Sequence, residues 1–127
     1  MIYVDSSAVL AELLAEDRRP GEAFWRNRLI ASRLLAYEVV NRLHNYGRST
    51  QTSDFSLLLL RIELVDLTEE TLSRALEPFP VAVRSLDGLH LATIAFIRQN
   101  GRELALASYD KRMLEAAAAL GVIGYPL

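Results

Sequence analysis

Residues 2–10, Ile-Tyr-Val-Asp-Ser-Ser-Ala-Val-Leu, place a strand directly before a helix. Ile2–Val4 is a short run of β-branched and aromatic residues, which is typical of a buried strand. The residues that follow are strong helix formers with an apolar face, and Ser6 and Ser7 can cap that helix. Asp5 therefore lies where the predicted strand ends and the predicted helix begins.

The same alternation of strand and helix continues along the chain. Further strands are predicted at 29–32, 62–67 and 104–107, and further helices at 33–47, 54–60, 68–77, 86–97 and 113–120. Strands that alternate with helices form a parallel sheet covered on both faces. We therefore expect an α/β fold, a three-layer sandwich in which helices flank a central parallel sheet.

Several helix ends can be predicted from single residues. Gly47 and Gly121 suit the left-handed position that follows a helix, and Ser85 is the better candidate to cap the helix over 86–97. That helix is apolar almost all round its axis, which marks a buried central helix. Phe55 and Leu57–Leu60 offer more apolar surface than one core face needs, so part of this surface is either buried or an interface.

Composition limits the possible functions. A chain of 127 residues, 51% apolar, has the size and core of one domain, which we place at residues 1–127. The net charge of −2 excludes a protein that binds nucleic acid over its whole surface, so any nucleic acid docks locally. The absence of cysteine excludes disulfides and thiolate ligands, and two histidines make an imidazole metal site unfavourable.

Membrane and export signals are also missing. The N-terminus has no basic segment, and no apolar stretch approaches the roughly 18 residues that would span a bilayer. We expect a cytoplasmic protein without a membrane partner.

Two aspartates follow predicted strands. Asp5 comes directly after the first strand, and Asp110 follows the strand at 104–107. In open α/β sheets, ligands bind beyond the carboxyl ends of the strands, so acids at these positions are candidate site residues. The alternative is that both aspartates are helix N-caps, which is the commonest role of an aspartate between a strand and a helix.

Two further acids lie on helices. Glu38 falls between Leu34 and Leu35 on an apolar stripe, where a carboxylate needs a partner, either Arg42 or a cation. Asp87 lies in the first turn of the apolar helix, where it either stabilises the helix dipole or points toward the crevice at the end of the sheet.

Together, these four acids predict a metal site. Ionised carboxylates that share a site require a proton or a cation between them, and all-oxygen ligands suit Mg²⁺ or Mn²⁺. Such ions promote phosphodiester hydrolysis. No serine-histidine or cysteine-histidine arrangement competes, and His90, on the buried helix, is interpreted as a core histidine.

Four stretches of the chain resemble the motifs of PIN-domain nucleases. They are Val4–Ala8, Tyr37–Val39, Leu86–Ala92 and Ala107–Arg112. The resemblance covers nearly the whole chain, and its size and spacing are most similar to VapC-type toxins of bacterial toxin-antitoxin pairs. It implies a PIN-like fold, RNA hydrolysis, and Asp5 and Asp87 as the primary Mg²⁺ ligands. Glu38 and Asp110 would complete the site or hold its water.

The resemblance also implies partners and supporting residues. It implies a homodimer and a cognate antitoxin protein that buries a peptide segment over the acidic groove. Ser7 and Ser108 match hydroxyl positions that support the acids in that family. The cationic side chains near the acids are either a phosphate-binding set or a solvated rim. They are Arg18, Arg19, Arg26, Arg28, Lys111 and Arg112.

Three alternatives remain at this point. A receiver-like Mg²⁺-binding signalling domain usually has adjacent acids after its first strand, whereas Asp5 is followed by two serines. A phosphatase of the haloacid-dehalogenase type needs a second aspartate where this chain has Ser7. A catalytically silent PIN-like binding module is the third, and the four intact acids argue against it.

Overall fold

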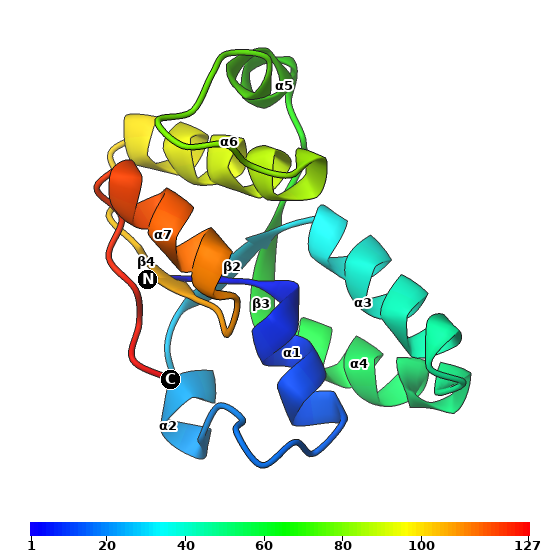
Figure 1. Cartoon of the computed structure of the whole chain (residues 1–127). Helices are drawn as coiled ribbons and strands as arrows, with labels where there is room; N and C mark the ends of the chain where they lie inside the picture. Colours follow the sequence, from blue (N-terminus) through cyan, green and yellow to red (C-terminus); the bar gives the residue numbers. More distant parts are fainter.

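The computed structural model describes residues 1–127, and it contains a four-stranded sheet with helices on both faces (Figure 1). All strand pairs are parallel, and the strand order is β3-β2-β1-β4. The strands are β1 (Ile2–Val4), β2 (Leu29–Ser32), β3 (Ile62–Val65) and β4 (Ala105–Ala107). The helices are α1 (Ser6–Leu13), α2 (Glu22–Trp25), α3 (Leu34–Asn45), η1 (Ser49–Gln51), α4 (Thr52–Leu59), α5 (Glu69–Ala75), α6 (Ser85–Gln99) and α7 (Lys111–Ala119).

Alternation along each strand divides the core into two layers. Ile2 and Val4 of β1 pack with residues of α1, α3 and α4, whereas Tyr3 between them packs against α6 and α7. Ile30 of β2 joins Tyr3 on the second face. Figure 1 shows α6 and α7 on one side of the strands and α1, α3 and α4 on the other. The predicted three-layer sandwich with a central parallel sheet is confirmed.

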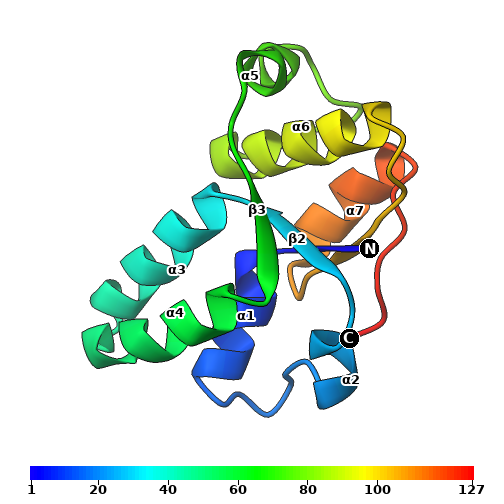
Figure 2. The same cartoon turned by 180° about the vertical axis from the view of Figure 1, so that it is seen from behind.

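The strand order places β1 in the interior of the sheet, between β2 and β4, while β3 lies at an edge that faces the viewer in Figure 2. Because all strands run in the same direction, their carboxyl ends meet along one side of the sheet. The backbone N–H of Asp5 donates to the carbonyl of Ala107 at 3.0 Å. The ends of β1 and β4 are therefore held together where the predicted site residues begin.

The predicted elements are all present, with differences at their ends. The last helix begins at Lys111 rather than 113, because Asp110 caps it. Ser6 and Ser7 do not cap α1, since the side chain of Asp5 accepts from the N–H of Ser7 and is the cap. The prediction that Ser85 caps α6 was also wrong: Ser85 is its first helical residue.

The predicted glycine positions are confirmed. Gly47 and Gly121 have φ angles of +67° and +79°, in the left-handed region that follows a helix. No helix in the chain is both long enough and apolar enough to cross a lipid bilayer. On α4, Phe55 is buried and Leu57 is 68% exposed, and Leu60, which caps the end of this helix, is 83% exposed.

Candidate active site

The four predicted acids come from four separate segments of the chain and line one pocket. Asp5 lies at the end of β1, Glu38 on α3, Asp87 in the first turn of α6 and Asp110 in the turn between β4 and α7. Arg42, Arg84 and three serines line the same pocket. The fold thus brings together all four of the predicted acids.

Asp5 is the most firmly held of these acids. Its side chain is buried, and its Oδ2 atom accepts hydrogen bonds from the hydroxyls of Ser7 and Ser108, each at 2.7 Å. Oδ2 also accepts a longer bond of 3.4 Å from the backbone N–H of Ser7, which caps α1. No hydrogen bond within the chain engages Oδ1, so this oxygen is free to accept from a ligand.

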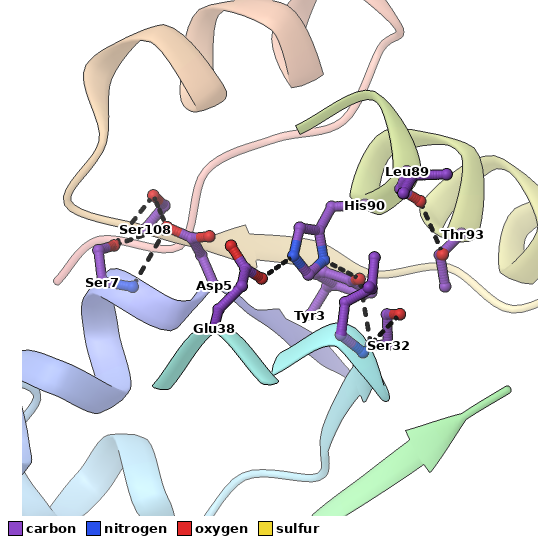
Figure 3. A network of polar contacts seen from close by, with 10 residues as sticks. Tyr3, Asp5, Ser7, Ser32, Glu38, Leu89, His90, Thr93 and Ser108 are labelled. Carbon is purple, nitrogen blue, oxygen red and sulfur yellow. Dashed lines mark hydrogen bonds and ion pairs between the residues drawn. The ribbon is translucent and has the colours of Figure 1, made fainter. Parts of the chain in front are cut away.

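The two serines are themselves oriented by the backbone. Ser7 Oγ accepts from the N–H of Tyr109 at 2.9 Å, and Ser108 Oγ accepts from the N–H of Asp110 at 2.9 Å. Because each hydroxyl accepts on one side, its own hydrogen is available to donate to Asp5. This network joins the end of β1 to the turn after β4 (Figure 3).

Asp110 also uses one oxygen for the fold. Its Oδ1 atom accepts from the backbone N–H groups of Arg112 and Met113 at 2.9 and 3.3 Å, and so caps α7. No hydrogen bond engages Oδ2. The helix-cap interpretation of both Asp5 and Asp110 is therefore correct, but capping leaves one oxygen of each carboxylate unused.

Glu38 bonds to a histidine rather than to Arg42. Its Oε1 atom is hydrogen-bonded to Nε2 of His90, and Figure 3 shows this bond as part of a chain that continues to Tyr3. His90 Nδ1 lies 2.7 Å from the Tyr3 hydroxyl, and that hydroxyl accepts from the N–H of Ser32 at 3.1 Å. Arg42 forms no ion pair.

His90 is a buried core residue, as predicted, but the sequence analysis missed its bond to Glu38. Its ring is fully buried and packs edge-on against Tyr3, with the ring centroids 5.8 Å apart. Two signals could have pointed to it: Glu38 required a partner, and His90 follows Asp87 by three residues on the same helix face.

The side chain of Asp87 makes no hydrogen bond within the chain. Burial raises the pKa of its carboxyl group, and the negative charges of Asp110 and Asp5 raise it further, followed in strength by that of Glu38. His90 opposes these effects. A cation in the pocket would relieve this repulsion, which is the electrostatic condition that favours a metal ion.

The charges of Asp5 and Glu38 also affect the pKa values of His90 and Tyr3. Burial of the ring opposes protonation of His90, but the hydrogen bond and charge of Glu38, with Asp5 and Asp87, raise its pKa above the ordinary value. Burial raises the pKa of Tyr3 far above its usual range, so its hydroxyl keeps its proton.

The donor set suits a hard divalent cation in its chemistry, since it offers carboxylate oxygens without thiolate. No three acidic or histidine side chains are arranged so that they could hold a metal ion. Binding one would therefore require movement of side chains such as that of Asp87, which no hydrogen bond within the chain holds in place.

Of the cationic side chains that the sequence indicated, Arg112 lines a pocket beside Asp87, but several others have partners elsewhere. Arg26, Arg28 and Lys111 pair with Glu22, Glu63 and Glu115, respectively. Arg18 lies over the ring of Tyr109, 5.3 Å from its centroid. These side chains belong to the solvated rim.

The three arginines that line the acidic pocket or its neighbour form no ion pair. Arg42 and Arg84 line the pocket of the four acids. Arg84 also lines a neighbouring pocket, together with Asp87, Arg112 and Met113. The sequence analysis missed Arg42 and Arg84 as pocket arginines, because only the fold brings them beside the acids.

The chain, a parallel α/β sheet with four acids near the carboxyl ends of its strands, belongs to the PIN domain family, whose model matches residues 2–119. It is 31% identical to Ribonuclease VapC47 of Mycobacterium tuberculosis over 97% of this chain and 94% of that protein. It is also 31% identical to Ribonuclease VapC46 of the same species, over 95% and 93% of the two chains.

Two solved structures share the fold. One is M. tuberculosis VapC20, described as a sarcin-ricin loop cleaving toxin, with a TM-score of 0.75. The other is a toxin-antitoxin complex from Klebsiella pneumoniae, with a TM-score of 0.69. Each is 17% identical to this chain, and each match covers the whole of both chains. Family membership does not favour the receiver-like or phosphatase alternatives.

Proposed function

We propose that this chain is a metal-dependent endoribonuclease, the toxin of a toxin-antitoxin pair, in which residues 1–127 act as a single domain. The observation that carries the proposal is the pocket itself: four carboxylates from distant segments line it, and each keeps at least one oxygen that no hydrogen bond engages. The relatives named as ribonucleases support RNA as the substrate. With cellular RNA as substrate, we expect the enzyme to act in the cytoplasm.

The residues that would hold Mg²⁺, or Mn²⁺ in its place, are Asp5 and Asp87, with Glu38 and Asp110 completing the site. When bound, a divalent ion supplies polarisation of a phosphoryl oxygen and lowers the pKa of a water molecule. Asp5 would present Oδ1, because Ser7 and Ser108 hold its Oδ2 atom.

Arginines would position the RNA. Arg42 and Arg84 line the acidic pocket, and Arg112 lines the neighbouring pocket that shares Asp87. None of the three guanidinium groups is neutralised by an ion pair, so each can contact a phosphate. This local cluster agrees with a chain whose net charge is −2.

A second pocket, separate from the acidic groove where the family resemblance implied the antitoxin peptide, supports an antitoxin partner. It lies between α1, α2 and α4, and its lining includes Glu12, Trp25 and Leu57. Glu12 Oε2 and Trp25 Nε1 are buried without a hydrogen-bond partner, which is costly in a folded protein. A bound peptide segment would cover Leu57, and a rearrangement of the pocket would let it supply an acceptor for the indole and a donor for the carboxylate.

We also propose a homodimer, on the basis of the family resemblance. Exposed apolar side chains outside that pocket, such as Leu76 at 89% exposure, offer contact surface for a second copy. Sedimentation equilibrium of the purified chain measures its oligomeric state directly.

The experiment that tests the nuclease uses purified protein and labelled RNA. We expect cleavage with Mg²⁺ or Mn²⁺, none with EDTA, and none in Asp5→Asn or Asp87→Asn. Asp66→Asn is the matched control, because Asp66 is an exposed partner of Arg33 outside the pocket, and it should cut normally. Cleavage that survives both pocket substitutions would contradict the site assignment, and a folded protein that never cuts RNA would be a silent binding module.

A further inference from the structure

The four acids are not held in the same way. Ser7 and Ser108 fix Asp5, and the backbone of α7 fixes Asp110. Glu38 has a longer side chain with more rotatable bonds, and the bond from its Oε1 atom to His90 is the hydrogen bond that restrains it. The orientation of Glu38 in the pocket therefore depends on the imidazole.

The imidazole cannot easily turn. His90 has 0% of its surface exposed, and its Nδ1 atom lies 2.7 Å from the Tyr3 hydroxyl. That hydroxyl accepts from the N–H of Ser32, and when the ring is neutral its own hydrogen is available to donate to Nδ1. The nearby Thr93 hydroxyl donates to the carbonyl of Leu89. Strand β1 thus fixes the ring from the side opposite to Glu38 (Figure 3).

The same contacts determine which nitrogen carries the proton. When the ring is neutral, Nδ1 accepts from Tyr3, and the hydrogen is on Nε2, facing Glu38. When the ring is charged, both nitrogens carry hydrogens, and Nε2–H still faces Glu38. In both states the histidine is a donor to Oε1.

We infer that His90 is a positioning residue of the active site: its Nε2–H, fixed by Tyr3, holds Oε1 of Glu38 so that Oε2 is presented to the divalent ion. This inference rests on the proposed function. Helix α6 would then set two of the four acids, Asp87 directly and Glu38 through His90 three residues later. A histidine that merely fills the core would have no such effect on Glu38.

Two substitutions separate positioning from packing. The side-chain nitrogen of glutamine reaches the place of Nε2, whereas that of asparagine reaches only the place of Nδ1. In His90→Asn we expect Mn²⁺ affinity, measured by calorimetric titration, to fall roughly 10- to 100-fold. We expect His90→Gln to recover most of it, with kcat following the same order and KM for RNA little changed.

Thermal unfolding of both variants provides the control for packing. The inference is overturned if the two variants bind Mn²⁺ as wild type does, or if they lose affinity equally. A wild-type protein that binds no Mn²⁺ and cuts no RNA would instead overturn the proposed function, and the inference with it.

If the variants do not fold, NMR of the wild-type protein tests the inference instead. The long-range ¹H–¹⁵N spectrum should show His90 with a slowly exchanging proton on Nε2, without any added metal. Exposed His44, whose Nδ1 atom lies 2.6 Å from Ser49 Oγ, provides the rapidly exchanging comparison. An unprotonated Nε2, or exchange as fast as that of His44, would overturn the inference.

Discussion

Asp5 combines a structural role and a chemical role in one side chain. Its Oδ2 atom caps α1 and accepts from two serine hydroxyls, while Oδ1 remains available. The usual contrast between a helix cap and a site residue does not apply here, since the cap fixes the direction of the free oxygen.

Among the four acids, Asp87 is the one whose negative charge most destabilises the folded, metal-free protein. Its pKa is raised in the folded chain, first by burial and then by Asp110 and Asp5. The charged carboxylate therefore lowers the free energy of unfolding at neutral pH, and this cost disappears as the pH falls below the ordinary pKa of an aspartate. Asp87→Asn should be more stable than wild type at pH 7 in EDTA, and equally stable in acid.

Urea unfolding at the two pH values measures this effect. Asp66→Asn is the control, since Asp66 is exposed and paired with Arg33, and its loss should not stabilise the chain. Added Mg²⁺ should stabilise wild type but have much less effect on Asp87→Asn. An Asp87→Asn protein that is less stable than wild type at pH 7 would contradict the electrostatic account.

At the scale of elements, the strands and helices could be predicted because local patterns determine them. The layers were predicted correctly from the apolar run Ile2–Val4 and from α6, which is apolar almost all round its axis. The ends of elements were less predictable, because alternative caps compete: Asp5 excludes Ser6 and Ser7 from that role, and Arg84 precedes α6 without a capping side chain.

The hydrogen bonds that orient the acids could not be predicted from local patterns. Glu38 and His90 are separated by 52 residues, and Asp5 and Ser108 by 103. Such contacts depend on how α3, α6 and the turn after β4 meet at the sheet, which no local pattern specifies. The sequence could place each acid after a strand or on a helix, but it could not choose between Arg42 and His90 as the partner of Glu38.

The second prediction concerns two arginines near the starts of α6 and α7. Arg84 precedes α6 and Arg112 lies in the first turn of α7, and both line the pocket beside Asp87. Arg84→Ala and Arg112→Ala should weaken RNA binding, and each should reduce the salt dependence of log K by about one unit per lost phosphate contact.

Filter binding of RNA by the metal-free protein at several salt concentrations provides the measurement. Arg26→Ala is the matched control. The side chain of Arg26, which follows the last residue of α2, is 76% exposed and pairs with Glu22 in that helix. An equal effect of all three substitutions would mean that general charge, rather than this pocket, binds the RNA.

At the scale of the whole molecule, the acidic pocket and the proposed antitoxin pocket share helix α1. Asp5 and Ser7 lie at its first turn, whereas Glu12 and Leu13 lie near its last. Figure 1 shows α1 running from the sheet toward α2 and α4. A partner that covers the second pocket would therefore bind beside the active site without needing its carboxylates.

Leu57 provides the third prediction, because it is 68% exposed and lines the proposed antitoxin pocket. Leu57→Glu should weaken binding of the cognate antitoxin, the small protein expected from the neighbouring gene, while RNA cleavage is retained. Leu60→Glu changes an equally apolar side chain, 83% exposed, outside that pocket, and should bind normally. Calorimetric titration with the purified antitoxin measures the affinity of each variant. Unchanged binding by Leu57→Glu would place the partner elsewhere.

The pairing of β1 with β4 has a consequence for synthesis on the ribosome. The segment with Asp5 emerges early, but the Ser108 hydroxyl that orients it lies 103 residues later. Contacts between such distant segments form slowly, because a long loop must close first. A nascent chain therefore carries an incomplete pocket until the segment with Ser108 has been translated and has packed beside β1.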